Sequence, residues 1–405
     1  MMLPKPTREQ GAWQDMEVVG FAHFGINTFT DREWGEGKED PRLFNPTHLD
    51  AAQWVRALKA AGIKMLILTA KHHDGFCLWP SRYTDHSVKH SPWRSGKGDV
   101  VGEVAKACRE GGIKFGFYLS PWDRHERTYG SPAYNEFFLN QLSELLTNYG
   151  PIAEVWFDGA NGEGSDGKRQ EYEWARYYAL IRRLQPHALI AICGPDIRWV
   201  GNESGVAREN ESSVQPVNRG AQQGAAFAWY PAECDVSIRP GWFYHSEQDA
   251  QVKTLDQLMD IYYKSVGRNS VLLLNVPPDR RGLISEIDAK RLAELGAEVR
   301  RRFGKSLAET KGRGGVVELS PRKPALIDHV IAMEDIRQGE RVREYVVEGL
   351  VKGEWREVCR GAIIGHKRIH RFEPIEVSRV RLRFLESAAE PIIRKLAVYD
   401  TGTRP

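Results

Sequence analysis

The chain has 405 residues, of which 57 are Lys or Arg and 54 are Asp or Glu, giving a formal net charge of +3. At about 150 residues per domain, this length allows two or three domains, although a parallel α/β barrel alone commonly takes about 250 residues. The charges are spread along the chain without a long basic run, so we expect no nucleic-acid partner, and a near-average apolar share argues against disorder, collagen and coiled coil.

Short apolar runs alternate with amphipathic stretches over the first 310 residues, which is the pattern of βα units around a parallel sheet. We expect strands at 20–26, 64–70, 114–120, 152–157, 188–193 and 270–276, and helices over 100–108, 138–149 and 174–184. No helix is expected over 196–240, so the sixth and seventh units should be irregular.

These elements predict a (β/α)8-like barrel with irregular units over residues 1–312. The alternative is a doubly wound sheet, but no Gly-x-Gly-x-x-Gly follows the first strand to favour a dinucleotide fold.

The pattern changes near the glycine-rich segment 310–315, which suggests a flexible hinge. Beyond it, Val380, Leu382 and Phe384 alternate with arginines, as in a half-buried antiparallel strand. We therefore expect a small antiparallel β-sandwich domain over residues 313–405, with a charged outer face that is ordinary solvated surface.

No stretch approaches about 18 consecutive apolar residues, and the first residues lack the apolar core of a secretory signal. We expect no membrane contact and a cytoplasmic location, or a secreted or periplasmic one if a signal has been removed. The five cysteines are scattered without a Cys-x-x-Cys pair, so neither zinc nor redox work is expected. We expect no cofactor, and the oligomeric state stays open.

Carboxylates, imidazoles and indoles follow five successive predicted strands. In a parallel barrel the loops at the carboxyl ends of the strands converge on one mouth, where active sites lie. In strand order, these residues are His23 with Glu33 and Trp34, then His72, His73 and Asp74, then Tyr118 and Trp122, then Trp156 and Asp158, then Asp196, Arg198, Trp199 and Glu203.

This set suits the hydrolysis of a sugar acetal, which needs one ionised and one protonated carboxyl group, with indoles and imidazoles to hold the sugar. A metal at His72, His73 and Asp74 is the weaker interpretation, because the first strand lacks a His-x-His motif. We expect no metal.

Each candidate also has a structural alternative. Asp158 could cap a turn, Glu203 could be a solvated loop residue, and His23, His72 and Trp156 could belong to the core. The 45-residue separation of Asp158 and Glu203 does not show by itself that their carboxylates meet (203 − 158 = 45).

Taken together, these segments resemble the retaining α-L-fucosidases of glycoside hydrolase family 29, over essentially the whole chain. The segments that carry the resemblance are 21–25 (Phe-Ala-His-Phe-Gly), 33–35 (Glu-Trp-Gly), 70–76 (Ala-Lys-His-His-Asp-Gly-Phe), 116–120 (Gly-Phe-Tyr-Leu-Ser), 154–159 (Glu-Val-Trp-Phe-Asp-Gly) and 274–278 (Leu-Asn-Val-Pro-Pro). The barrel-plus-sandwich layout agrees with it.

The resemblance implies that Asp158 is the nucleophile and forms a covalent fucosyl-enzyme, with its partner carboxyl about 5–5.5 Å away. It also implies that fucose is surrounded by His23, Glu33, Trp34, His72, His73 and Tyr118, with Trp156 beside the nucleophile.

The segment 194–205 resembles the subfamily restricted to α-1,3 and α-1,4 linkages on branched, Lewis-type glycans, which implies that Glu203 is the acid/base. The segments 229–235 and 239–242 fit the same subfamily and make Glu233 and Trp242 contacts of the substrate, with Glu209 and Glu211 as alternative acids. Because Glu203 must hold a proton while Asp158 stays ionised, we expect Glu203 in the drier or more anion-crowded environment.

The resemblance thus implies an exo-acting retaining α-1,3/1,4-L-fucosidase whose partner is a fucosylated oligosaccharide or glycoconjugate. The alternatives are a broad α-L-fucosidase that also takes α-1,2 linkages, and a catalytically inactive fucose-binding protein with a lectin-like sandwich.

Overall fold

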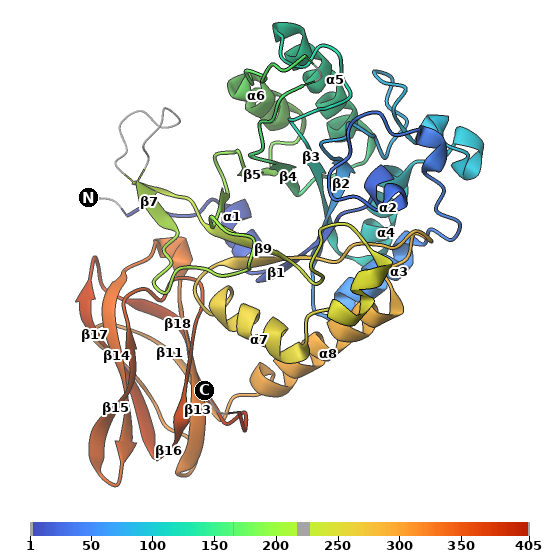
Figure 1. The fold of residues 1–405 in the computed structure, drawn as a ribbon. Helices are drawn as coiled ribbons and strands as arrows, with labels where there is room; N and C mark the ends of the chain where they lie inside the picture. Colours follow the sequence, from blue (N-terminus) through green and yellow to red (C-terminus); the bar gives the residue numbers. More distant parts are fainter. Residues whose placement is uncertain (1–2, 165, 217–226, 404–405) are drawn as a thin grey trace.

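The computed structural model describes residues 3–164, 166–216 and 227–403, which form a parallel barrel followed by a β-sandwich (Figure 1). The barrel sheet has the order β5-β4-β3-β2-β1-β10-β9-β6. Its strands are β1 (Val18–Ala22), β2 (Met65–Lys71), β3 (Lys114–Leu119), β4 (Glu154–Phe157), β5 (Leu189–Ile192), β6 (Arg198–Trp199), β9 (Ala232–Ser237) and β10 (Val271–Asn275). A parallel bridge between Ala191 and Ile197 links the two ends, so the sheet is nearly closed, and the predicted barrel is confirmed.

The helices of the chain flank the barrel. They are α1 (Arg8–Gln14), α2 (Ile26–Thr30), α3 (Ala51–Ala60), α4 (Val100–Gly111), α5 (Pro132–Asn148), α6 (Trp174–Leu184), α7 (Leu255–Lys264) and α8 (Glu286–Phe303). None of these described helices is long and apolar enough to cross a membrane. The described part of 196–240 holds only short strands, including β7 (Val214–Pro216) and β8 (Phe227–Trp229), as the irregular units were expected to do.

The first strand ends earlier than the sequence predicted, at Ala22 rather than at residue 26. The chain leaves the sheet at His23 and enters α2 at Ile26. The backbone N–H groups of His23 and Phe24 donate to the side chains of Asn275 and Thr69 instead of to the backbone of a neighbouring strand. The early exit turns the chain into the mouth of the barrel.

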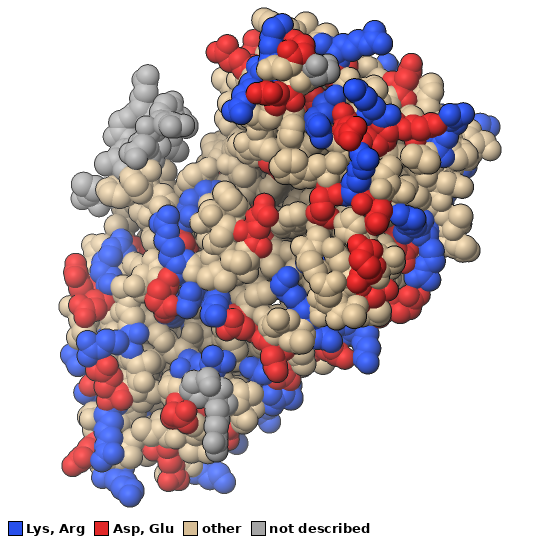
Figure 2. Space-filling model, in the orientation of Figure 1, with Lys and Arg blue, Asp and Glu red and all other residues tan. Residues whose placement is uncertain are grey.

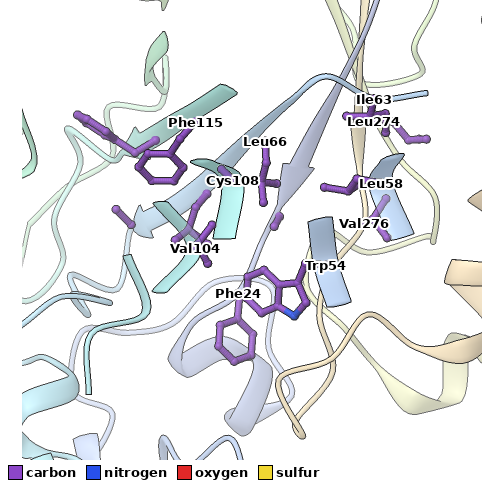
Figure 3. Packing of buried hydrophobic residues seen from close by; sticks show 14 of the residues in the cluster. Phe24, Trp54, Leu58, Ile63, Leu66, Val104, Cys108, Phe115, Leu274 and Val276 are labelled. Carbon is purple, nitrogen blue, oxygen red and sulfur yellow. The ribbon is translucent and has the colours of Figure 1, made fainter. Parts of the chain in front are cut away.

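A continuous apolar core fills the space between the strands and helices α3 and α4 (Figure 3). Trp54, Leu58, Val104 and Cys108 come from one face of each helix and are almost fully buried against strand residues such as Leu66. Both helices start at an aspartate, Asp50 or Asp99, whose side chain accepts a hydrogen bond from a backbone N–H of the first turn. Local capping and apolar spacing therefore fix these two βα units.

The sandwich consists of two four-stranded antiparallel sheets, with the orders β11-β18-β13-β16 and β12-β17-β14-β15. Its strands are β11 (Ala308–Arg313), β12 (Val316–Leu319), β13 (Ala325–Glu334), β14 (Val342–Val351), β15 (Glu354–Gly361), β16 (Arg368–Val377), β17 (Arg379–Ser387) and β18 (Ile392–Tyr399). Val380 and Leu382 of β17 are fully buried, as their alternation predicted.

The flexible hinge expected at 310–315 is wrong. Residues up to Arg313 belong to β11, which pairs with β18 from Ala308 onward, and only Gly314 and Gly315 form the turn into β12. The alternating exposure of β11 explains the misreading, because an edge strand with Glu309, Lys311 and Arg313 on its outer side looks like a loop in the sequence. On the face shown in Figure 2, acidic and basic side chains are intermingled over both parts of the chain.

Candidate active site

The carboxyl ends of β1, β2 and β3 bring three predicted residues into one cluster of rings. The ring centroids of His23 and His72 are 5.7 Å apart, and the rings of His72 and Tyr118 stack at 5.7 Å with an angle of 15° between their planes. Trp156, from β4, stacks on the other side of Tyr118 at 5.2 Å. Parallel strands place these ends side by side, so four segments far apart in the sequence form one wall.

Asp158 lies one residue beyond β4 and is held at both oxygens. The hydroxyl of Tyr118 donates to Oδ2 at 3.0 Å, and the backbone N–H of Ala160 donates to Oδ1 at 2.7 Å. The side chain is 25% exposed, and Nε2 of His73 lies 3.9 Å from Oδ2. Oδ1 of Asp158 thus caps the turn at Ala160, which was the structural alternative for this residue. The carboxylate nevertheless faces the mouth.

The three histidines of the mouth are neutral at physiological pH. Burial lowers the pKa of His23 to about 3 and that of His73 to about 4, in the latter case against the opposing charge of Asp158. Burial also holds the pKa of His72 well below its ordinary value. A neutral imidazole offers one donor and one acceptor, which suits the hydroxyl groups of a sugar.

The ring nitrogens of these histidines differ in their protein contacts. Nδ1 of His23 lies 2.9 Å from Oδ1 of Asn275, and Nδ1 of His73 lies 2.7 Å from Oγ of Ser120. The Nδ1 atom of His72 is buried and has no hydrogen-bond partner among the described residues. Buried polar atoms are normally paired, so this atom is a candidate contact for a bound ligand.

Glu33 and Trp34, predicted as fucose contacts, play different parts. The Glu33 carboxylate accepts the backbone N–H groups of Trp242 at 2.7 Å and Phe243 at 3.2 Å. Gly241 makes this approach possible, since a Cβ atom there would lie 2.5 Å from Oε1 of Glu33. Trp34 is 57% exposed, with its ring edge-on to that of His73, and it presents an apolar face to solvent.

Glu233, predicted as a substrate contact, is fully buried. It faces the barrel lumen from β9, where Trp156 donates its indole N–H to Oε2 at 2.9 Å. Burial raises the pKa of Glu233 to about 8. The charge of Asp235 acts in the same direction. Burial and the charge of Glu233 hold the pKa of Glu154 on β4 well above its ordinary value, and Trp13 donates to Glu154 at 2.9 Å. Glu233 therefore lies in the layer below the mouth, because side chains of β9 alternate between the lumen and the outer core.

Asp235 is a site residue that the sequence analysis did not single out. It lies two positions after Glu233 on β9, is 5% exposed, and accepts the indole N–H of Trp199 at 2.7 Å. Burial raises its pKa to about 7, and the charges of Glu203 and Asp158 act in the same direction. Asp235 therefore lies near both predicted catalytic carboxylates. The alternation of Glu233, Asp235 and Ser237 along β9 was the available signal.

Glu203 lies in a loop that is hydrogen-bonded to β9 both before and after Glu203. Backbone N–H groups of Val200 and Gly205 donate to the carbonyls of Glu233 and Asp235 at 3.0 and 3.1 Å. The indole N–H of Trp242 donates to Oε2 of Glu203 at 3.3 Å, and the Trp242 ring lies 5.1 Å from that of His23. The structure thus places Glu203 and Trp242 at the same mouth as His23.

Glu203 was expected to occupy the drier or the more anion-crowded environment of the two carboxylates, and it is not the drier one. Glu203 is exposed, whereas the side chain of Asp158 is only 25% exposed. The loop projects from the rim of the barrel, so water reaches it. Asp235 is an acidic side chain near both Glu203 and Asp158, so it does not distinguish the two.

The alternative acids Glu209 and Glu211 have structural partners. Glu211 is buried and forms an ion pair with Arg198, and Glu209 pairs with Arg268 and Arg368 at the junction with the sandwich. Asp74, weighed as a metal ligand, accepts hydrogen bonds from Asn27 and from the backbone N–H of Phe76, and its Oδ2 lies 4.0 Å from Nδ1 of His72.

A barrel mouth with two carboxylates, neutral imidazoles and an exposed indole defines the site of a glycoside hydrolase. The family model described as alpha-L-fucosidase matches residues 8–302. The chain therefore belongs to the α-L-fucosidases of glycoside hydrolase family 29.

Individual relatives cover nearly the whole chain. Alpha-L-fucosidase 1 of Arabidopsis thaliana is 43% identical over 98% of this chain and 88% of its own length. A solved glycoside hydrolase 29 family member from a rumen bacterium is 44% identical, with a TM-score of 0.93 over 100% of this chain and 78% of that one. A Ruminococcus gnavus GH29 fucosidase, solved in complex with fucose, is 31% identical, with a TM-score of 0.89 over 98% of this chain and 95% of that one.

Proposed function

We propose that this α-L-fucosidase is an exo-acting, retaining enzyme that removes fucose from α-1,3- and α-1,4-linked branched glycans, with Asp158 as nucleophile and Glu203 as acid/base. The observation that carries the proposal is the setting of Asp158, whose carboxylate faces the mouth and is oriented by the Tyr118 hydroxyl and the Ala160 N–H. Glu203 is the second carboxylate at that mouth, linked to it through Trp242.

In the first step, a carboxylate oxygen of Asp158 attacks the anomeric carbon of fucose while Glu203 gives its proton to the glycosidic oxygen. The bond to the leaving sugar breaks and a covalent fucosyl-enzyme forms. In the second step, Glu203 takes a proton from water, the water oxygen attacks the anomeric carbon, and Asp158 leaves as a carboxylate. The Tyr118 hydroxyl stabilises the charge that returns to Asp158.

The surrounding groups suit fucose. The neutral imidazoles of His23, His72 and His73 can each donate and accept, as hydroxyl groups require. Trp34 presents an indole face that can pack on the apolar side of a deoxy sugar.

The residues near Glu203 at the rim of the barrel support the proposed linkage preference. Trp199 is 41% exposed and is fixed through its N–H to Asp235, which lies near Glu203. An indole held there offers a flat surface to the sugar that carries the fucose, which a branched glycan would place beside the acid.

Two measurements test the proposal. The first is proton NMR of the fucose first released from an aryl α-L-fucoside, which we expect to be the α anomer; early β-fucose would overturn retention. The second compares release from a Lewis trisaccharide and from 2′-fucosylated lactose. We expect release from the trisaccharide to be much faster, and equal rates would overturn the linkage restriction.

A further inference from the structure

His245 lies behind the mouth, between two carboxylates of a different loop. Its Nδ1 is 2.8 Å from Oδ1 of Asp31, and its Nε2 is 2.7 Å from Oε1 of Glu33. The residue is only 6% exposed. Ionised carboxylates only accept hydrogen bonds, so both ring nitrogens must carry protons, and the ring is an imidazolium.

Three carboxylates face His245. Besides Asp31 and Glu33 from the first βα loop, Glu247 of its own turn has Oε1 4.0 Å from Nδ1. Burial acts to lower the pKa of His245, but the hydrogen bonds and charges of Glu33 and Asp31 outweigh burial and raise it above its ordinary value. The electrostatics thus agree with the geometry.

The carboxylate that His245 fixes also holds the turn that carries Trp242. Glu33 accepts the backbone N–H groups of Trp242 and Phe243, at 2.7 and 3.2 Å. From the other side, the Asn275 amide donates to the Trp242 carbonyl at 2.8 Å. The Trp242 indole in turn donates to Glu203. Contacts therefore run without a break from His245 through Glu33 and Trp242 to the carboxylate at the rim.

We propose that His245 is a positioning residue, whose imidazolium clamps Glu33 onto the 241–245 turn and thereby places Glu203 for proton transfer through Trp242. This inference rests on the proposed role of Glu203 as acid/base. Glu203 is exposed, and its loop is held by backbone contacts to β9 and by the Asn202 side chain, so among the described residues the Trp242 hydrogen bond is what orients the Glu203 side chain.

The clamp depends on pH in a definite direction. A group whose pKa is raised in the folded protein keeps its interaction at low pH and loses it as pH rises through the raised pKa. The clamp should therefore be complete in mildly acidic solution and weaken on the alkaline side. Proton donation to poor leaving groups should weaken with it.

The test compares His245→Gln and His245→Asn. The Gln amide can donate near the position of Nε2, toward Glu33, whereas the Asn amide can donate only near the position of Nδ1, toward Asp31. His187→Asn is the matched control, because the exposed His187 forms a hydrogen bond with Glu9 just before β5, at the opposite end of the barrel.

Amide hydrogen exchange measures the clamp without reference to activity. We expect exchange at Trp242 and Phe243 to become at least about tenfold faster in His245→Asn, less so in His245→Gln, and to stay unchanged in His187→Asn. Unchanged exchange in His245→Asn would overturn the clamp, whether or not the wild type cleaves fucosides.

Leaving-group kinetics measure the link to Glu203. In His245→Asn we expect kcat to fall by about 10- to 100-fold for an alkyl fucoside, which needs protonation, and much less for a nitrophenyl fucoside. In the wild type, kcat for the alkyl fucoside should decline toward alkaline pH. The pH at which this decline occurs should change in His245→Asn. Equal losses on both substrates would overturn the link to Glu203, and a wild type inactive on both would overturn the proposed function instead.

Discussion

Two buried glutamates, one in the barrel and one in the sandwich, differ in how fully their carboxylates are hydrogen-bonded. Glu334 of β13 is 1% exposed, and its carboxylate accepts backbone N–H groups from Arg341, Val342 and Gly365 at 2.8 to 3.1 Å. Glu233 of β9 is fully buried, yet it accepts only the indole of Trp156, and its Oε1 has no partner among the described residues.

The difference separates a group that stabilises the fold from a group that serves the site. Burying a carboxylate without full pairing costs free energy, which a protein tolerates mainly where a ligand or a neighbouring reaction uses the group. In the sandwich, a well-paired glutamate closes a turn between strands. In the barrel, Glu233 keeps an oxygen without a partner among the described residues, and its other oxygen accepts from Trp156, two residues before Asp158.

The substitution Asp158→Asn tests this comparison with the largest expected effect. We expect kcat/KM on any α-L-fucoside to fall by at least about 10³-fold, because the nucleophile is lost, while the melting temperature stays close to that of the wild type. Steady-state kinetics and thermal melts measure both. Asp166→Asn, an exposed aspartate in the same loop, is the control and should keep full activity. A variant that unfolds would make Asp158 a structural turn residue like Glu334.

Glu203→Ala should give a smaller and more selective loss. We expect a drop of about 10²- to 10⁴-fold on alkyl fucosides and natural glycans, but little loss in the first step with nitrophenyl or fluoride leaving groups, which need no proton. Pre-steady-state kinetics separate that step from hydrolysis of the intermediate, and added azide should restore turnover. Glu209→Gln is the control, because Glu209 pairs with Arg268 and with Arg368 of the sandwich. Equal losses across leaving groups would disqualify Glu203 as the acid.

Tyr118→Phe removes the hydrogen bond to Oδ2 of Asp158 and leaves the ring stack on His72 and Trp156. A hydrogen bond to a charged group is worth about 1.5–3 kcal/mol, so we expect kcat to fall by about 10- to 100-fold, with KM much less affected. Tyr83→Phe, on the surface, provides the control. Wild-type kcat in Tyr118→Phe would mean that the hydroxyl does not orient the nucleophile.

The two glutamates themselves give a stability test. Glu334→Gln should destabilise the fold by about 1–3 kcal/mol without changing kcat, because the amide NH2 must face at least one backbone N–H donor. Urea unfolding monitored by circular dichroism measures the loss. A fully stable Glu334→Gln variant would remove the contrast between the two domains.

Glu233→Gln should instead change how stability depends on pH. The pKa of Glu233 is raised to about 8 in the folded chain, so its proton stabilises the fold below the ordinary carboxyl pKa, and that contribution is lost as pH rises toward 8. The Gln variant keeps the protonated shape and should therefore lose less stability than the wild type between pH 5 and pH 8. Parallel pH profiles of the two proteins would show that Glu233 is ionised throughout.

The sequence predicted the barrel and six of its eight strands, because those strands are continuous apolar runs and their helices carry one apolar face, but it did not predict β6 and β9. It also located Asp158 and the histidine cluster, since polar residues stand directly after those runs. It could not show that Glu233 lies below the mouth, because that depends on which residues of β9 face the lumen. Nor could it pair His245 with Glu33, 212 residues earlier, since only the closed barrel brings those loops together.

The most direct test of the account is labelling with 2-deoxy-2-fluoro-fucosyl fluoride, followed by peptide mapping. The fluorine slows hydrolysis of the intermediate and lets the covalent adduct accumulate. We expect one fluorofucosyl group per chain, attached to Asp158. Attachment to Asp235, Glu233 or Glu203, or turnover of the reagent without any adduct, would contradict the assignment of Asp158 as the nucleophile of a retaining α-L-fucosidase.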